Sequence, residues 1–178
     1  MTFDLEARVR RLEDRVLISD RVISYAVAVD QHDWALFADC FTDPVHADYS
    51  ENGLPAADFA RDDLVDIVRS AVIGYTATQH LSANHVTEFD PDDPDRATCH
   101  SSMYAQHHLA DGDELLILRG WYANHLVRVA NGWKIDRIVQ TCQLARGQTY
   151  MTDGLDRGED VHMDDGASPT STEPDVPA

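Results

Sequence analysis

The feature that most constrains the fold is a change in the spacing of apolar residues along the chain. Near the N-terminus, Leu5, Val9, Leu12 and Val16 recur at intervals of four, three and four residues, which predicts an amphipathic helix. After residue 75 the pattern becomes that of strands, in long segments separated by short turn sequences. Helices first and strands later predict an α+β fold, in which the helices pack on the concave side of a curved antiparallel sheet.

The same patterns place the individual elements. A second helical stretch follows the first, with Val22, Ile23, Ala26 and Val29, and a short helix is expected within 33–41. A further amphipathic helix is expected from Leu64 to Val72, where Gly74 stands in the position at which glycine commonly ends a helix. A brief strand at 45–50 precedes that helix. Long strands are expected at 76–89, 96–109, 115–129 and 133–145.

The composition changes near residue 148. Residues 151–178 carry eight acidic residues, one Arg, three Pro and no apolar periodicity. Such a segment buries too little apolar surface to offset the entropy lost when it becomes ordered. We therefore expect one α+β domain over residues 1–148 and an acidic, disordered tail over 149–178.

The charge excludes several classes of partner. The chain has 32 acidic and 14 basic residues, a net charge of -18. A surface this negative repels nucleic acids and anionic membranes, so neither is expected as a partner. No apolar run approaches the roughly 20 residues of a membrane span, and the N-terminus lacks the regions of a signal peptide. The expected location is cytoplasmic.

The cysteines and histidines form no recognisable disulfide or metal pattern. Cys40, Cys99 and Cys142 are far apart and odd in number, which predicts free thiols. His80 and His85 are five residues apart on one expected strand, so they point to opposite faces unless a bulge intervenes. Because no Cys–His or H-E-x-x-H ligand spacing occurs, no metal site is expected.

Strand alternation groups the polar residues that could line one face of the sheet. His80 and Asn84 share a face of their strand. His100 lies on the next strand, and Tyr122 and Asn124 share a face of the third. These side chains are the candidates for contact with a ligand.

Asp30 is a further candidate because it ends an apolar helix face, after Val27-Ala28-Val29. A carboxylate there is costly to bury unless it is paired. It either remains in water at the helix end or holds a histidine imidazole in one tautomer and raises its basicity. The second arrangement serves proton abstraction.

A set of short segments, spread over about residues 4–147, occurs in a characteristic order: Leu12-Glu13-Asp14, Ile18, Tyr25, Asp30, Asp33-Trp34, Phe41, Asp48-Tyr49, Gln79-His80-Leu81-Ser82-Ala83-Asn84, Tyr122-Ala123-Asn124 and Gly132-Trp133-Lys134-Ile135. This order resembles that of SnoaL-like proteins of the nuclear transport factor 2 superfamily. The similarity is to the branch that holds scytalone dehydratase, the bile-acid 7α-dehydratase and hexachlorocyclohexane dehydrochlorinase. The resemblance implies a cone, a curved and mostly antiparallel sheet around a pocket that the helices close.

The resemblance also implies a site. The catalytic Asp–His dyad of the family matches Asp30 and His80. Scytalone dehydratase uses two tyrosines and a second histidine, which match Tyr25 or Tyr49 and His100.

Other substrate-binding positions follow from the same resemblance. The Asn of scytalone dehydratase matches Asn124, whereas Tyr122 stands where that enzyme has a serine, a departure that would shrink the pocket. Asn84 and Trp34 complete the set of expected substrate-binding residues.

These residues predict a cofactor-independent lyase of the dehydratase type, or an isomerase. His80, oriented by Asp30, would take a proton from a small hydrophobic cyclic substrate that is polyketide-, steroid- or terpenoid-like. Tyr49 and His100 would polarise a carbonyl or assist a leaving hydroxyl. Two alternatives remain open: a non-catalytic small-ligand-binding protein of the same fold, and a structural β-type subunit of a ring-hydroxylating dioxygenase.

The expected strand 115–129 is apolar on both faces. Leu116, Leu118 and Leu126 alternate with Ile117, Trp121 and Val127. A strand that is apolar on both faces in a small domain suggests burial of its outer face against another copy of the chain. We therefore expect a homodimer or a homotrimer.

Overall fold

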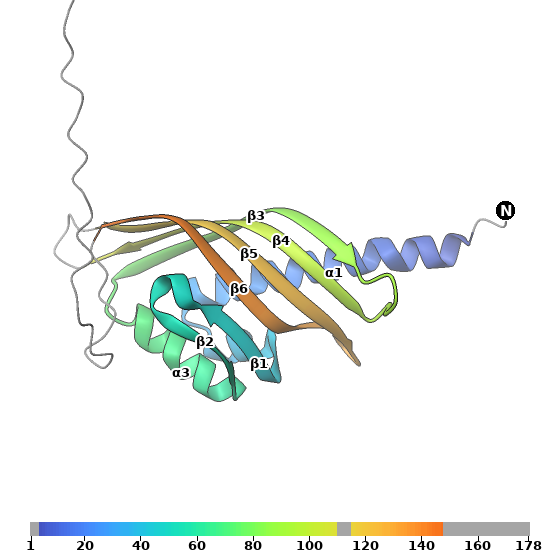
Figure 1. The fold of residues 1–178 in the computed structure, drawn as a ribbon, viewed down its shortest axis with the longest axis horizontal. Coiled ribbons are helices and arrows are strands. Elements are labelled where there is room, and N and C mark those ends of the chain that lie inside the picture. Colours follow the sequence, from blue (N-terminus) through green and yellow to red (C-terminus); the bar gives the residue numbers. More distant parts are fainter. Residues whose placement is uncertain (1–3, 110–114, 148–178) are drawn as a thin grey trace, which may run out of the picture.

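The structure is a computed structural model that describes residues 4–109 and 115–147 (Figure 1). The tail predicted over 149–178 lies outside the described residues. The elements are α1 (Leu5–Gln31), α2 (Trp34–Asp39), β1 (Phe41–Tyr49), the short 3-10 helix η1 (Ser50–Asn52), β2 (Leu54–Phe59), α3 (Arg61–Val72), β3 (Ala77–Phe89), β4 (Arg96–His108), β5 (Leu115–Val129) and β6 (Gly132–Arg146).

The six strands form one sheet in the order β2-β1-β6-β5-β4-β3. Neighbouring strands are antiparallel except β1 and β6, which are parallel. Register shifts interrupt the pairing of β3 with β4 and of β5 with β6, and such bulges bend strands and increase their twist. The sheet is therefore curved, with helices on its concave side (Figure 1). The predicted α+β fold is confirmed.

The core fills the space between the helices and the concave face of the sheet. Ile18 and Val22 from α1, Phe37 from α2, and Ile135 and Ile138 from β6 are almost fully buried. Each of these side chains contributes about 1.5–3 kcal/mol when it leaves water. This core holds the helix ends and the inner faces of the strands in fixed relative positions.

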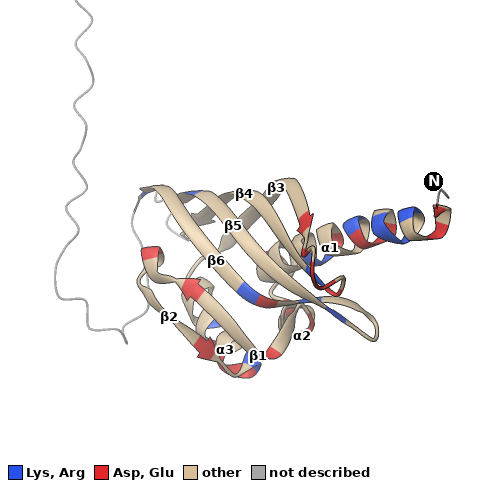
Figure 2. Ribbon diagram, turned by 45° about the vertical axis from the view of Figure 1, so that its right-hand side comes forward, with Lys and Arg blue, Asp and Glu red and all other residues tan. Residues whose placement is uncertain are grey.

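The sequence suggested two successive helical stretches at the N-terminus, but α1 is continuous over 27 residues. Its core face consists of Asp14, Ile18, Val22, Tyr25 and Val29, all buried. The apolar stripe that first indicated the helix, which begins at Leu5, lies on the opposite face and is exposed. Figure 2 shows that this part of α1 projects beyond the sheet and carries both basic and acidic bands.

The strand β2 was not expected from the pattern of apolar residues. This strand is short, contains Pro55 and forms one edge of the sheet, where a missing backbone N–H is tolerated. The thiols of Cys40, Cys99 and Cys142 are free, as predicted, with the first two buried and Cys142 partly exposed. Among the residues described, no helix is both long and apolar enough to cross a membrane.

Candidate active site

Asp30 lies in the last turn of α1, a position where the helix dipole disfavours a carboxylate. Three donors from β3 compensate for this. The hydroxyl of Thr78 donates to Oδ1 at 2.9 Å, the backbone N–H of His80 donates to Oδ2 at 2.8 Å, and Nδ1 of His80 lies 2.6 Å from Oδ1. β3 forms one edge of the sheet. The backbone N–H of His80 points outward from this edge and can therefore donate to Asp30 at the end of α1.

These contacts keep the carboxylate of Asp30 ionised. Burial acts to raise the pKa of Asp30, but the hydrogen bonds from His80 and Thr78 outweigh it and the pKa lies below its usual value. The side chains of His80 and Asp30 are only 12% and 22% exposed. An ionised partner at Nδ1 fixes the neutral imidazole as the Nδ1–H tautomer, which leaves the Nε2 lone pair as a base. The contact expected between Asp30 and His80 is present.

His107 is the nearest ring to His80 from the neighbouring strand, and the sequence analysis missed it. The imidazoles of His80 and His107 meet edge to face with their centres 5.1 Å apart, and the ring centre of Tyr75 lies 4.8 Å from that of His107. Burial lowers the pKa of His107 to about 4, with a further contribution from the neighbouring His80. Its Nδ1 is buried and has no hydrogen-bond partner in the described chain, so a neutral ring with one free polar atom faces the dyad.

A second polar group consists of three tyrosines in the interior. Tyr25 of α1, Tyr49 of β1 and Tyr122 of β5 are all at least 92% buried. The hydroxyls of Tyr25 and Tyr49 lie 3.4 Å apart, the rings of Tyr25 and Tyr122 meet edge to face at 5.8 Å, and Gln140 donates to the Tyr122 hydroxyl at 3.1 Å. Burial raises the pKa of all three phenols. They therefore remain protonated and can donate hydrogen bonds.

Asn124 and Trp34 flank these groups. Asn124 is 1% exposed, and its Oδ1 has no partner among the described residues, although its Nδ2 lies 3.5 Å from the carbonyl of Cys99. Trp34 is the first residue of α2, stacks on His32 and is partly buried beneath Arg69 of α3. Asn124 faces the interior as expected.

His100 does not face the interior, so that expectation was wrong. On β4 the odd-numbered residues Cys99, Ser101 and Met103 are buried, whereas His100 is exposed on the outer face. The sequence carried the signal: small or apolar residues occupy the odd positions of this strand and polar residues the even ones, which assigns the even positions to solvent. His107, near the other end of β4, follows the odd positions inward and is buried.

Asn84 is also on the outer face, contrary to the expectation from strand alternation. The register of β3 shifts between Ala83 and Val86, and Asn84 adopts a positive φ of 56° at this bulge. Its Nδ2 donates to Ser102 on the exposed side of β4 at 3.2 Å. The bulge reverses the alternation of the strand, so Asn84 leaves the face that His80 occupies.

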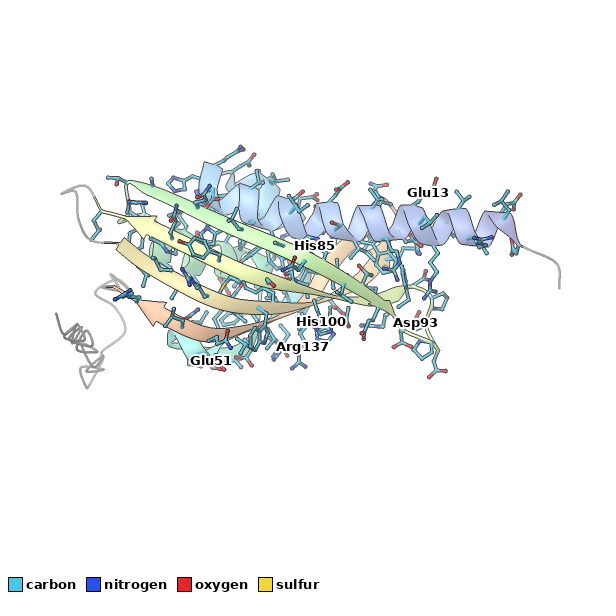
Figure 3. All side chains as sticks on the ribbon, turned by 90° about the horizontal axis from the view of Figure 1, so that it is seen from above. Glu13, Glu51, His85, Asp93, His100 and Arg137 are labelled. Carbon is cyan, nitrogen blue, oxygen red and sulfur yellow. The ribbon has the colours of Figure 1, made fainter. Side chains whose placement is uncertain are left out.

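The same bulge turns His85 inward. Its Nδ1 lies 2.8 Å from the hydroxyl of Ser19 on α1, and its Nε2 lies 3.1 Å from that of Ser82. Figure 3 shows His85 beside α1, which runs along the β3 edge of the sheet, and His100 farther across the sheet. Within the described ranges, no group of three or more His, Cys, Asp or Glu side chains could hold a metal ion.

A protein-family model matches most of the chain. Residues 10–139 match the SnoaL-like domain. The chain belongs to the SnoaL-like family. No curated protein matches the sequence.

Solved structures of several bacterial proteins resemble this SnoaL-like domain. A protein from Kribbella flavida is 28% identical with a TM-score of 0.71, over 76% of this chain and 95% of that one. A proposed scytalone dehydratase from Novosphingobium aromaticivorans is 20% identical with a TM-score of 0.70, over 84% and 97% of the two chains. The hexachlorocyclohexane dehydrochlorinase LinA-type3 from Novosphingobium barchaimii is 17% identical with a TM-score of 0.69, over 79% and 94%. At these identities the last two establish the fold alone.

Proposed function

We propose that this SnoaL-like protein is a cofactor-independent lyase of the dehydratase type, or an isomerase, that acts on a small hydrophobic cyclic substrate. The observation that supports this most is the pairing of Asp30 with His80 at 2.6 Å in a mostly buried position. A mostly buried Asp–His pair at the end of a helix is an arrangement suited to proton abstraction. The proposed steps use only side chains of this protein and no cofactor.

In the proposed reaction the Nε2 of His80 takes a proton from a carbon next to a carbonyl. The C–H electron pair moves toward the carbonyl and forms an enol or enolate. Asp30 stabilises the imidazolium that results, because its carboxylate already accepts from Nδ1. General base assistance of this type accelerates reactions by about 10²–10⁴-fold.

The second half of the reaction is an elimination or a reprotonation. In a dehydratase, the enolate electrons expel a hydroxyl from the neighbouring carbon, and that hydroxyl takes up a proton and leaves as water. In an isomerase, the proton returns to another carbon. The protonated His80 can supply the proton in either case, and the raised pKa of Tyr49, caused mainly by burial, keeps its phenol available as a hydrogen-bond donor.

His107 supports the proposal as a group for substrate binding. Its ring is neutral at physiological pH because burial lowers its pKa to about 4, so it does not repel the imidazolium of His80. Its Nδ1, which has no partner among the described residues, can accept a hydrogen bond from a substrate hydroxyl. The aromatic rings of Tyr75 and the buried tyrosines favour a flat, apolar ligand.

The pairing of Asp30 with His80 also favours an enzyme over the binding protein considered above. A binding protein for an apolar ligand gains nothing from an ionised carboxylate that burial alone would destabilise. The alternative as a β-type dioxygenase subunit does not require the dyad either. Loss of the dyad therefore separates the enzyme from these two alternatives, since only an enzyme depends on it.

The experiment is a proton-exchange assay in D₂O. Purified protein is incubated with a panel of hydroxylated cyclic ketones of polyketide, steroid and terpenoid type, and deuterium uptake and loss of water are followed by mass spectrometry. At least one ketone is expected to exchange the proton next to its carbonyl, or to lose water, faster with the protein than without it. His80→Ala should remove this acceleration.

The matched control is His100→Ala, which removes a histidine from the exposed face of the same sheet. This variant should retain the rate. If protein fluorescence showed that ketones of the panel bind but none of them exchanged protons, the result would favour the binding protein. Equal loss of rate in both variants would contradict the role of His80.

A further inference from the structure

The N-terminal half of α1 carries an apolar stripe that faces solvent. Leu5, Val9, Leu12 and Val16 are 67%, 44%, 64% and 59% exposed. The stripe faces away from the domain because the opposite side of the helix, which includes the buried Asp14, packs on the sheet. Figure 1 shows this half of α1 extending past the sheet, so the described part of the chain leaves room for a partner there.

The stripe has the spacing of a two-stranded coiled coil. Val9, Val16 and Ile23 are seven residues apart and define the a position of a heptad. Leu5 and Leu12 then fall on the d position. Valine or isoleucine at a, together with leucine at d, is the combination that favours parallel dimers over trimers and tetramers.

The charges beside the stripe select the partner and its direction. Arg8 and Arg15 occupy the g position, whereas Glu6, Glu13 and Asp20 occupy the e position. In a parallel pair, each g residue faces the e residue five positions later on the other helix. Arg8 then meets Glu13 of the partner subunit, and Arg15 meets Asp20 of the partner subunit. An antiparallel pair would instead place arginine against arginine and carboxylate against carboxylate.

We propose that a second copy of this chain docks on the stripe and forms a parallel coiled coil over residues 5–23. The seam would be roughly 27 Å long at 1.5 Å per residue. It would relate the two copies by a two-fold axis along the helices. The third d position is Ser19, whose hydroxyl lies 2.8 Å from His85 of its own domain, so the seam weakens where the helix joins the sheet.

This interface differs from the one suggested by the apolar outer face of the sheet. Leu81, Val86 and Trp121 on that face are also exposed, at 50%, 54% and 46%. They are not flanked by a repeating charge pattern that identifies a partner. The experiment therefore compares variants of the two surfaces.

The test measures the mass of the full chain by analytical ultracentrifugation. The double variant Leu12→Asp with Val16→Asp should sediment at half the mass of the wild type. The control Leu81→Asp with Trp121→Asp alters two exposed apolar residues of the sheet and should leave the mass unchanged. Both variants replace exposed side chains, and an unchanged melting temperature would show that each still folds. A monomeric wild type at micromolar concentration, or an unchanged mass in the helix variant, would overturn the proposal.

Charge reversal tests the identity of the partner. Arg8→Glu with Arg15→Glu, and separately Glu13→Arg with Asp20→Arg, should each raise the dimer Kd by roughly tenfold or more through repulsion of like charges. Mixing the two variants should restore a dimer that contains one copy of each. Failure of the mixture to pair would contradict the proposed seam.

A cross-linking experiment tests the direction. Leu5→Cys in a Cys142→Ser background should form a disulfide-linked dimer on mild oxidation, because a parallel seam places residue 5 beside its equivalent. An antiparallel pair would separate these positions by the length of the seam. Absence of the linked dimer while the mass remains dimeric would therefore overturn the parallel arrangement.

Discussion

Asp14 and Arg128 join α1 to the end of β5 through two hydrogen bonds of 2.7 Å each. The indole N–H of Trp133 donates to the same carboxylate at 3.0 Å, and the guanidinium lies 4.4 Å from the centre of the Trp133 ring. Asp14 is 5% exposed. The hydrogen bond from Arg128 is the main reason that the pKa of Asp14 lies below its usual value. These contacts hold the long helix against the sheet.

Asp14→Ala should therefore destabilise the fold. The substitution leaves the buried indole N–H and part of the guanidinium without an acceptor, and we expect a loss of about 3 kcal/mol in the free energy of unfolding. Urea denaturation at pH 7 measures it. Asp39→Ala is the matched control, because it removes contacts of an exposed carboxylate with Arg21 and Lys134 and should cost below about 1 kcal/mol. Equal losses in the two variants would contradict the structural role of Asp14.

The stability contributed by Asp14 also depends on pH. A carboxyl whose pKa is lower in the folded state favours folding above its unfolded pKa, and this contribution is lost as the pH falls through the folded value. The difference between wild type and Asp14→Ala should accordingly be constant from pH 7 to about 5 and shrink below about pH 4. A difference that grows toward acid would show the opposite sign and contradict the assignment.

His107 is expected to make stability pH-dependent in a different range. Its pKa falls from 6.5 to about 4 on folding because the ring is buried. Between these values the unfolded chain binds a proton that the folded chain does not, so stability decreases as the pH falls from about 6.5 to 4. A shift of one pKa unit corresponds to about 1.4 kcal/mol, so the full loss in the free energy of unfolding is about 3 kcal/mol.

Urea denaturation at several pH values between 7 and 4 measures this effect. His107→Phe keeps an aromatic ring in place and should flatten the dependence, whatever its effect on stability at pH 7. His100→Phe replaces an exposed histidine and should leave the slope as it is in the wild type. If the unfolding free energy of His107→Phe still decreased between pH 6.5 and 4, the proton would bind to a group other than His107.

Most of the fold could be predicted because apolar periodicity depends on residues that are close together in the sequence. Apolar periodicity predicted the helices and the four long strands to within a few residues, and the residues matching the SnoaL-like family indicated the Asp30–His80 contact. The features of the site that were not predicted depend on one bulge in β3 and on which face of β4 is buried. One inserted residue near Asn84 reverses which face β3 presents, and neither its position nor its positive φ follows from the sequence of the strand alone.

The exposed stripe on α1 shows a further limit of sequence patterns. Periodicity identifies an apolar face but not the surface against which it packs. Leu12 and Ile18 both belong to apolar helical spacing, yet Leu12 is 64% exposed and Ile18 is fully buried. Which face meets the sheet depends on distant contacts such as the pair of Asp14 and Arg128.

Gly120 should tolerate no side chain. It lies at the register shift between β5 and β6, where a Cβ would come within 1.8 Å of the backbone oxygen of Thr141. Because the clashing atom is backbone, the strands must separate, and Gly120→Ala should lose roughly 3 kcal/mol or fail to accumulate as folded protein. Gly74→Ala is the control, because no atom lies within 4 Å of its Cβ position and its stability should change little. Thermal unfolding of both variants compares them.

The pKa of Asp30 offers a test of the dyad that needs no substrate. The hydrogen bonds of His80 lower this pKa against the effect of burial. His80→Ala removes the imidazole and should raise the pKa of the Asp30 carboxyl, as followed by carbon NMR in labelled protein. Thr78→Val removes one hydrogen bond and should raise it by less. A pKa that does not move in His80→Ala would mean that the two side chains do not interact in solution.

Kinetics of a double variant would then test whether Asp30 and His80 act as a unit in the proposed reaction. His80→Ala should reduce turnover by orders of magnitude in protein that still folds, although loss of the contact with Asp30 also lowers its stability. Asp30→Asn should cost nearly as much, because the amide favours the wrong imidazole tautomer. The double variant should be little slower than His80→Ala, since residues that act as a unit give non-additive losses. Additive losses would assign the two residues separate roles, even if each proves essential.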